Sequence, residues 1–249
     1  MKSTFAVVAV LAALSTAAQA ADLKICVEGA YPPFSSTAAD GSVVGFDIDI
    51  ANALCGEMGM SCEMVKSDWD GIIPALLERK CDAIIASMSI TPERMQVIDF
   101  SNKYYQTPAK FAGAAGMTVA ELDGKTVGVQ RGTIHQSFLE GEFPGVELKL
   151  YGSQDEAYLD LVAGRVDAIM ADSIAISDGF LATDAGEGFA FFGGDYADPK
   201  YHGVGAGIGV RQGEEELRNA FSHAIGRIRG TGEYSTINAK YFDFDIYGG

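Results

Sequence analysis

Apolar and polar positions along the chain follow two periods, one typical of buried strands and the other typical of amphipathic helices. A first series of alternating strands and helices covers 23–28, 46–58, 63–66, 70–77 and 82–86. A second series has the same order over 126–130, 133–140, 146–151, 154–163 and 167–171. This alternation predicts an α/β fold in which mostly parallel sheets are flanked by crossover helices.

The last long apolar pattern predicts a helix over 214–229. Its apolar residues recur at helical spacing and would form one buried face: Leu217, Phe221, Ala224, Ile225 and Ile228. The glycine-rich stretch 230–232 should then separate this helix from a last short one.

Two stretches of the chain, 76–87 and 161–172, resemble each other. Each runs from a helix end through a basic turn into a buried strand, which finishes on a polar residue, Ser87 or Asp172. Any helix-to-strand unit can produce such a likeness, but two similar lobes would produce it as well. Because ligands bind at the carboxyl ends of strands in open parallel sheets, we expect Ser87 and Asp172 to face each other across a cleft.

The first twenty residues have the pattern of a secretory signal peptide. Lys2 is followed by an apolar run over 5–14 and by the small-residue cleavage site Ala18-Gln19-Ala20. The apolar run is too short to span a bilayer. The sequence therefore predicts removal of residues 1–20 and a soluble, exported product that begins at Ala21.

Charge, cysteines and histidines indicate which partners, disulfides and metal sites to expect. With 34 acidic and 18 basic residues the net charge is −16, which disfavours binding to nucleic acid. In an oxidising compartment Cys55 and Cys62 are predicted to form a disulfide between a helix end and the next strand. Cys26 and Cys81 each lie at a strand start and are expected to be buried free thiols. The three histidines are scattered (His135, His202 and His223), so neither a metal site nor a cofactor is expected.

Arg94 is a candidate anion ligand. Thr91 is a good N-cap and Pro92 a good first helical residue, which would place Arg94 in the first turn of a helix. A cation is unfavourable at that end of the helix dipole, and a surface arginine offset by Glu93 is the ordinary alternative. However, Arg94 follows the strand end that faces the proposed cleft, so a carboxylate there would meet both the guanidinium and free backbone N–H groups.

Aromatic residues near the first strand end suggest how a ligand side chain is held. Tyr31 and Trp69 both lie just past predicted strands, and Glu28 ends the first strand. Core packing is the usual role of such aromatics. In a cleft they would instead sandwich an aliphatic or guanidinium side chain whose charge meets the Glu28 carboxylate.

Several stretches together resemble a known family. The matching segments are 28–34, 45–50, the Cys55 and Cys62 pair, 84–91 with Arg94, 128–131, 163–168, Asp172 and 240–248. Over essentially the whole mature chain they are similar to the periplasmic lysine/arginine/ornithine- and histidine-binding proteins of ABC importers, which are solute-binding proteins of family 3. Segment 128–131 and the C-terminal ending look most like the arginine/ornithine-binding members.

The resemblance implies a two-lobed periplasmic binding protein of type II. Two hinge strands would join lobe 1, residues 21–107 plus 202–249, to lobe 2, residues 108–201. Such a protein is a monomer that closes around a free basic amino acid (arginine or ornithine first, then lysine or histidine) and delivers it to a permease in the inner membrane.

Roles follow residue by residue from the same resemblance. Arg94 would hold the ligand carboxylate with the backbone N–H groups of Ser89 and Ile134. Asp172, the Ser87 carbonyl and the Ser89 hydroxyl would bind the α-ammonium group. The side chain would lie between Tyr31 and Trp69, with its distal cation on Glu28. The sequence departs from the relatives at three positions, because Glu28 replaces an aspartate, Ala86 a serine and Ile134 a threonine; these departures leave the choice among the basic amino acids open.

Two other functions are compatible with the same fold. Cyclohexadienyl dehydratases are periplasmic enzymes of this architecture that need a general acid beside a ring substrate, but no Ser-His-Asp or metal pattern is visible here. A sensory role, in which the closed form contacts a receptor, is the third possibility.

Overall fold

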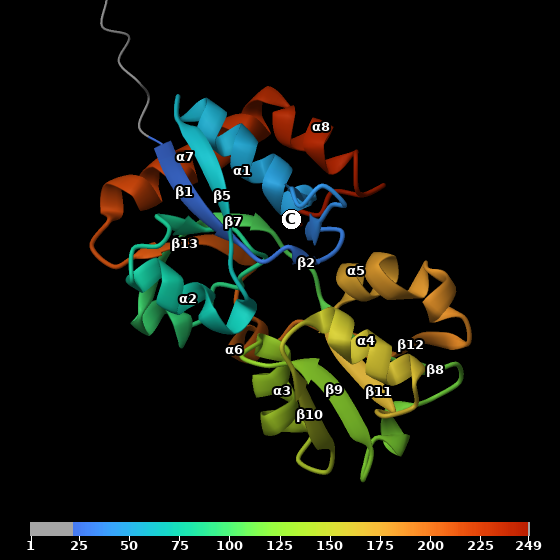
Figure 1. Cartoon of the computed structure of the whole chain (residues 1–249). Helices are drawn as coiled ribbons and strands as arrows, with labels where there is room; N and C mark the ends of the chain where they lie inside the picture. Colours follow the sequence, from blue (N-terminus) through green and yellow to red (C-terminus); the bar gives the residue numbers. More distant parts are fainter. Residues whose placement is uncertain (1–21, 249) are drawn as a thin grey trace, which may run out of the picture.

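The computed structural model describes residues 22–248, and the predicted signal peptide lies outside them. The described chain forms two lobes, each built on a five-stranded sheet (Figure 1). The sheet of the first lobe has the order β5-β1-β6-β13-β7, with β1 at Asp22–Val27, β5 at Ser61–Lys66, β6 at Ala83–Ile84, β7 at Ile98–Tyr105 and β13 at Ala206–Arg211. The sheet of the second lobe has the order β10-β9-β11-β8-β12, with β8 at Ala109–Ala114, β9 at Thr126–Gln130, β10 at Glu147–Tyr151, β11 at Ala168–Asp172 and β12 at Phe189–Tyr196.

Both sheets combine parallel and antiparallel pairs. In the first, β1 is parallel to β5 and β6, whereas β13 is antiparallel to β6 and β7. In the second, β9 is parallel to β10 and β11, whereas β8 is antiparallel to β11 and β12. The strand–helix alternation of the sequence predicted the parallel pairs. The antiparallel strands adjoin the two connections between the lobes, because β7 leads to β8 through 106–108 and β12 leads to β13 through 197–205. The exact lobe boundaries remain a prediction.

Helices cover the sheets of both lobes. The first lobe carries α1 (Phe46–Glu57), α2 (Trp69–Leu77), α7 (Glu215–Thr231) and α8 (Glu233–Asn238), together with a small sheet of β2 (Ala30–Tyr31), β3 (Ser35–Thr37) and β4 (Val43–Val44). The second lobe carries α3 (Ile134–Glu142), α4 (Gln154–Val162) and α5 (Ser173–Ile176), and α6 (Pro199–His202) lies in the second connection. Short 3₁₀ turns are η1 (Arg94–Gln96), η2 (Val119–Glu121) and η4 (Asp184–Gly186), and η3 (Ser177–Leu181) is a short π-helix that follows α5.

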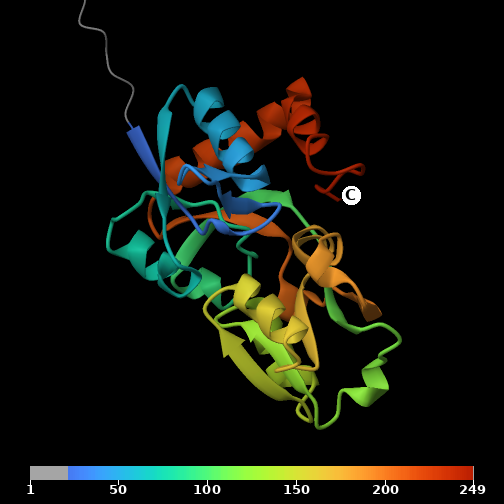
Figure 2. The same cartoon turned by 45° about the vertical axis from the view of Figure 1, so that its right-hand side comes forward.

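The C-terminal segment packs back onto the first lobe, as Figure 2 shows. Helix α7 buries four residues of the face predicted from the sequence, Phe221, Ala224, Ile225 and Ile228, whereas the fifth, Leu217, is only partly buried. It continues through Thr231 and ends at Gly232, whose φ of +84° is the left-handed conformation that glycine adopts readily at helix ends. Beyond α8, the ring of Phe242 lies 5.2 Å from that of Phe46 in α1, so the end of the chain completes the core of this lobe.

All four cysteines form disulfides. Cys55 is bonded to Cys62, as the sequence predicted, and Cys26 is bonded to Cys81. The expectation that Cys26 and Cys81 are free thiols is therefore wrong. Strand β1 lies beside β6, which brings Cys26 next to the residue that precedes β6 by two positions, although the two cysteines are 55 positions apart.

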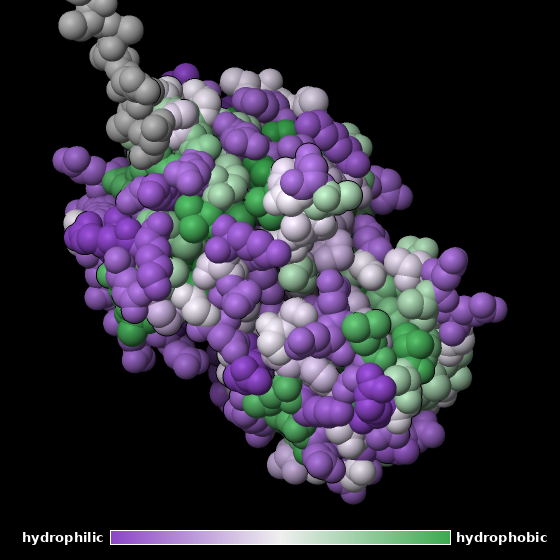
Figure 3. Space-filling view, in the orientation of Figure 1, coloured by the Kyte–Doolittle hydropathy of each residue, from purple (hydrophilic) through white to green (hydrophobic). Residues whose placement is uncertain are grey.

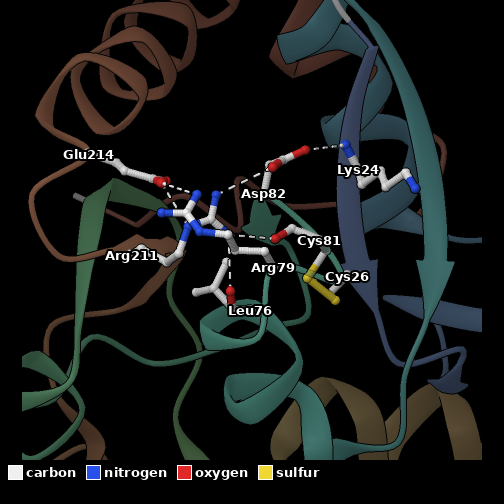
Figure 4. Close-up of polar contacts among 8 residues, drawn as sticks. All are labelled: Lys24, Cys26, Leu76, Arg79, Cys81, Asp82, Arg211 and Glu214. Carbon is white, nitrogen blue, oxygen red and sulfur yellow. Dashed lines mark hydrogen bonds and ion pairs between the residues drawn. A yellow bond between two sulfur atoms is a disulfide. The ribbon is translucent and has the colours of Figure 1, made fainter.

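Arg211 fixes the turn that leads into β6 (Figure 4). Its buried guanidinium donates hydrogen bonds from Nη1 to the carbonyls of Leu76 (3.0 Å) and Cys81 (2.6 Å), and from Nε to Glu214 Oε1 (2.7 Å). Asp82 accepts from Arg211 on one side and from the backbone N–H of Lys24 on the other. Four charge-assisted contacts of Arg211, together with the hydrogen bond from Lys24 to Asp82, thus hold the turn that enters β6.

The surface seen in Figure 3 is mostly hydrophilic, with small separate apolar patches. Within residues 22–248, no helix combines the length and the apolar character that a membrane span requires.

Candidate functional site

A cavity lies between the two lobes and is lined by both. The first lobe contributes Glu28, Tyr31, Trp69, Ala86, Ser87, Ser89 and Arg94, and the second contributes Gln130, Thr133, Ile134, His135 and Asp172. The structure therefore brings together every residue that the sequence singled out for ligand binding. The particular role of each remains a prediction.

Arg94 enters the cavity from a single turn. The predicted helix is only the three-residue 3₁₀ turn η1, because β7 begins at Ile98 and leaves no room for more. The turn begins at Arg94 with Glu93 as its N-cap, so the expectation of Thr91 as N-cap and Pro92 as first helical residue is wrong. The Thr91 hydroxyl still accepts a hydrogen bond from the Arg94 backbone N–H (3.3 Å).

The Arg94 guanidinium is held in place but keeps free donors. Nη1 donates to the Ser89 carbonyl (3.0 Å), Nη2 donates to the Gly132 carbonyl (3.4 Å), and the group lies 5.2 Å from the centre of the Trp69 ring. Burial lowers the Arg94 pKa to about 10, so the group remains a cation at neutral pH. Its remaining N–H groups suit a planar anion such as a carboxylate.

Asp172 ends strand β11 and faces the cavity from the second lobe. Its Oδ2 accepts a hydrogen bond from the Tyr31 hydroxyl (3.1 Å), which also accepts from the Asp172 backbone N–H (3.3 Å). Burial raises the pKa of Asp172 to about 6, and the Tyr31 hydroxyl and the Arg94 charge oppose this rise. Tyr31 thus contributes its hydroxyl to the site, while its ring stacks on Phe34 at 5.9 Å.

Glu28 is a buried carboxylate in the lining of the cavity, with only 5% of its surface exposed. Its Oε1 accepts a hydrogen bond of 2.6 Å from Gln130 Nε2. Burial raises the pKa of Glu28 to about 7, the hydrogen bond from Gln130 lowers it, and the charges of Asp155, Asp68 and Asp70 raise it further. A cation bound beside Glu28 would relieve both the burial cost and this repulsion.

Trp69 and Arg131 connect the lobes along the cavity and its rim. Trp69 Nε1 donates to the Gly132 carbonyl at 3.2 Å. Outside the cavity, Arg131 of the second lobe forms an ion pair of 2.5 Å with Asp70 of α2, and both side chains are partly exposed. These contacts join the faces of the two lobes.

Gln130, Thr133 and His135 line the cavity but were not predicted from the sequence. Gln130 is the last residue of the parallel strand β9, so the strand-end rule that selected Ser87 and Asp172 would also have found it. Thr133 caps α3 and donates to the Gln130 carbonyl at 2.7 Å. The ring of His135 lies 6.1 Å from that of His202, a proximity that their spacing in the sequence does not reveal. In the part of the chain that the structure describes, no three acidic, histidine or cysteine side chains converge as a metal site would require.

Residues 23–244 match the family model of bacterial extracellular solute-binding proteins, family 3. The chain belongs to this family. Among relatives, it is 50% identical to the L-arginine-binding protein of Pseudomonas aeruginosa over 246 residues, covering 96% of this chain and 95% of the relative. It is 42% identical to the lysine/arginine/ornithine-binding periplasmic protein of Escherichia coli over 259 residues, covering the whole of both chains.

Solved structures of family members share the same architecture. A periplasmic binding protein of Salmonella typhimurium with high arginine specificity aligns with a TM-score of 0.84 and 34% identity, over 90% of this chain and all of that one. An ancestral arginine-binding protein bound to arginine aligns with a TM-score of 0.81 and 33% identity, over 89% of this chain and 98% of that one. The fold is thus the two-lobed type II architecture of this family, and these relatives are named as binding proteins, not as enzymes.

Proposed function

We propose that this family 3 protein is the periplasmic solute-binding component of an ABC importer and closes its two lobes around a free basic amino acid. Arginine or ornithine is the preferred ligand in this proposal, followed by lysine or histidine. The single observation that carries it is the arrangement of three charged groups in one cavity: Arg94, Asp172 and Glu28.

The charges match the three ionic groups of a basic amino acid. The ligand carboxylate would bind the Arg94 guanidinium and the backbone N–H groups of Ser89 and Ile134. The α-ammonium group would bind Asp172, the Ser87 carbonyl and the Ser89 hydroxyl. The aliphatic part would lie against Tyr31 and Trp69, which both line the cavity.

The distal end of the cavity supports a cationic side chain. Glu28 is buried without an ion-pair partner among the described residues, and three further carboxylates contribute negative potential there. A neutral side chain would leave this charge unpaired, which is costly in a buried site. The names of the relatives, which include arginine-, lysine/arginine/ornithine- and histidine-binding proteins, point to the same ligand class.

Closure of the lobes supplies the mechanism. Arg94 and Glu28 belong to the first lobe and Asp172 to the second, so one zwitterion contacts both halves of the molecule. A ligand that bridges the lobes favours the closed form by the contacts that it makes only there. The connections at 106–108 and 197–205 would act as the hinge between lobe 1 (21–107 and 202–249) and lobe 2 (108–201).

Location and partner belong to the same proposal. Cleavage after residue 20 would release the mature protein into the periplasm, where the closed monomer would dock on an inner-membrane permease. The relatives named as periplasmic binding proteins support this location.

A ligand screen tests the proposal. Thermal unfolding is measured with each of the twenty amino acids and with ornithine and citrulline, and positive ligands are then titrated by calorimetry. Binding of a ligand to the native state alone raises the melting temperature by mass action, so basic amino acids should give the largest shifts. If none of these compounds raises the melting temperature, the proposal fails.

One of the structural comparisons bears on the dehydratase alternative. The chain aligns with an ancestral amino-acid-binding protein described as a precursor of cyclohexadienyl dehydratase, with a TM-score of 0.78 and 28% identity, and Glu28 with a pKa near 7 would suit a general acid. Appearance of the absorbance of an aromatic product on incubation with prephenate or arogenate would favour this alternative. Unchanged absorbance, together with an arginine-induced thermal shift, would favour the binding protein.

A further inference from the structure

Ser87 has an unusual backbone conformation beside the predicted ammonium position. Its φ is +54°, and it is one of two non-glycine residues with positive φ in the described chain. This left-handed region is disfavoured for residues that carry a Cβ atom, so surrounding contacts must hold it in place. Ser87 lines the cavity, which makes the cause of this conformation relevant to binding.

Two buried residues of the first lobe hold Ser87. The Ser87 hydroxyl donates a hydrogen bond of 2.9 Å to Asp47 Oδ2, and the Ser87 backbone N–H donates one of 3.0 Å to the Tyr104 hydroxyl. The Tyr104 hydroxyl in turn donates to Asp47 Oδ1 at 2.8 Å. Ser87, Asp47 and Tyr104 therefore form a closed triangle that joins α1, β7 and the segment after β6.

Asp47 is the centre of this triangle and is completely buried. Among residues 22–248 it has no ion-pair partner, and its two oxygens accept from the two hydroxyl groups. Asp49, two positions later on the same helix, pairs instead with Lys240 at the surface. A buried carboxylate without a cation carries a desolvation cost, which binding of a cation nearby would offset.

We propose that Asp47 is a positioning residue for the α-ammonium group of the ligand. Through Ser87 it holds the left-handed conformation that directs the Ser87 carbonyl toward the amine, and its charge attracts the amine from the first lobe while Asp172 attracts it from the second. Burial is the main cause that raises the pKa of Asp47 to about 7, the Tyr104 and Ser87 hydroxyls oppose the rise, and the charge of Asp172 adds to it. An ammonium group between the two carboxylates would remove this repulsion. The inference rests on the proposed function, because it assumes that an amino acid occupies the cavity.

The proposal predicts that the loss of affinity on replacing Asp47 depends on the amine of the ligand and not on its side chain. Every amino acid carries the α-ammonium group, so loss of Asp47 should weaken arginine and lysine by the same factor. Glu28 differs in this respect, since its effect should depend on the side chain. A purely structural role of Asp47 would weaken every ligand, with or without an amine.

A double-mutant cycle tests whether Asp47 acts through Ser87. Glycine adopts the left-handed conformation without strain, so Ser87→Gly keeps the backbone geometry and removes the hydroxyl. Asp47→Asn alone should weaken arginine about ten-fold, which corresponds to about 1.4 kcal/mol. In the Ser87→Gly background the same change should weaken arginine less than about three-fold, because coupled residues have non-additive effects. Asp49→Asn is the matched control and should leave the Kd unchanged.

A deaminated ligand separates positioning from general damage. Competition calorimetry with 5-guanidinopentanoate, which is arginine without its amine, should show that Asp47→Asn reduces the preference for arginine over this analogue by about ten-fold. Equal weakening of both compounds, fully additive mutations, or a change below two-fold in Asp47→Asn would each overturn the inference. If Asp47→Asn does not fold, Tyr104→Phe removes the other anchor of Ser87 and is put through the same comparisons. If the unmutated protein binds no amino acid, the proposed function itself fails, an outcome distinct from all of these.

Discussion

Gln130 Nε2 donates a 2.6 Å hydrogen bond to Glu28 Oε1, although the two residues come from different lobes and lie 102 positions apart. Gln130 ends β9 of the second lobe, and Glu28 directly follows β1 of the first. The same amide nitrogen donates to the Gly152 carbonyl at 3.2 Å, so both of its hydrogens are used. The amide oxygen of Gln130 and the second carboxylate oxygen of Glu28 are then left as acceptors. The distal end of the cavity is therefore suited to a ligand group that only donates, such as guanidinium or ammonium.

Glu28→Gln should remove the selectivity for a cationic side chain. Breaking a buried charge pair typically costs about 2–5 kcal/mol, so arginine should bind at least about thirty-fold more weakly. Glutamine, which carries no side-chain charge, should change by less than about three-fold. Calorimetric titration of both ligands measures the difference. Equal losses of affinity for the two would show that Glu28 does not contribute to recognition of the ligand side chain.

Gln130→Leu should weaken arginine without unfolding the protein. The substitution removes the group that orients Glu28, and a hydrogen bond to a charged group contributes about 1.5–3 kcal/mol. The expected loss of affinity is therefore about ten-fold or more. Gln212→Leu, at an exposed position, is the matched control and should bind arginine normally. Unchanged affinity in Gln130→Leu would mean that the interlobe hydrogen bond contributes nothing to the bound state.

Stabilisation by arginine should increase with pH. Burial raises the pKa of Glu28 from 4.5 to about 7 and that of Asp172 from 3.8 to about 6. Because both values are raised, protonation stabilises the ligand-free fold; this contribution is complete below about pH 4 and is lost as the pH rises through 6 and 7. Burial also raises the pKa of Asp47, so its contribution to stability is likewise lost as the pH rises. Burial lowers the pKa of His135, which therefore stays neutral. A bound cation favours the ionised carboxylates and reverses the effect.

Thermal unfolding with and without saturating arginine measures this dependence. The guanidinium and carboxylate of arginine keep their charges between pH 5 and 7.5. The arginine-induced rise in melting temperature should be larger at pH 7.5 than at pH 5, and Glu28→Gln should reduce the difference. A rise that is equal at the two pH values would contradict the assignment of these carboxylates to the ligand.

Much of the site could be predicted from local rules. Asp172 was found because it ends a buried strand and Ser87 because it follows one. Arg94 and Glu28 were singled out by their positions near predicted strand ends, and the resemblance to the family then gave each of them a role. Local sequence rules do not show which residues that are far apart in the sequence come into contact when each lobe folds. The Asp47–Ser87–Tyr104 triangle joins residues 40 and 57 positions apart, and no local pattern indicates that a serine there has positive φ.

The error at Cys26 and Cys81 has the same origin. Cys81 lies two residues before β6, as predicted, but Cys26 lies near the end of β1 and not at a strand start. The order of strands in the sheet was not known from the sequence. A parallel sheet permits several orders, and only the one with β1 beside β6 brings these two cysteines within bonding distance. Similarly, the short turn at Arg94 follows from the position of β7, which the alternation pattern did not predict.

Arg94→Ala should weaken arginine by roughly thirty-fold to several thousand-fold, because truncating one partner of a buried charge pair costs about 2–5 kcal/mol. Arg131→Ala is the matched control. Arg131 also connects the lobes, but its ion pair with Asp70 is partly exposed and should contribute less than about 1 kcal/mol. Calorimetry distinguishes the two, and a change below five-fold in Arg94→Ala would exclude Arg94 as the carboxylate ligand.

The Cys26–Cys81 disulfide should stabilise the first lobe more than Cys55–Cys62 does. In the chain-entropy account a disulfide restricts the unfolded chain, and the restriction grows with the loop that it closes. The two bonds span 55 and 7 positions, which corresponds to a difference of about 2 kcal/mol in this account. Urea unfolding should therefore show a larger loss of free energy for Cys26→Ser with Cys81→Ser than for Cys55→Ser with Cys62→Ser. Thiol labelling of the exported, unfolded protein should find no free cysteine, and labelling at Cys26 or Cys81 would show that this bond does not form, whatever the stability data indicate.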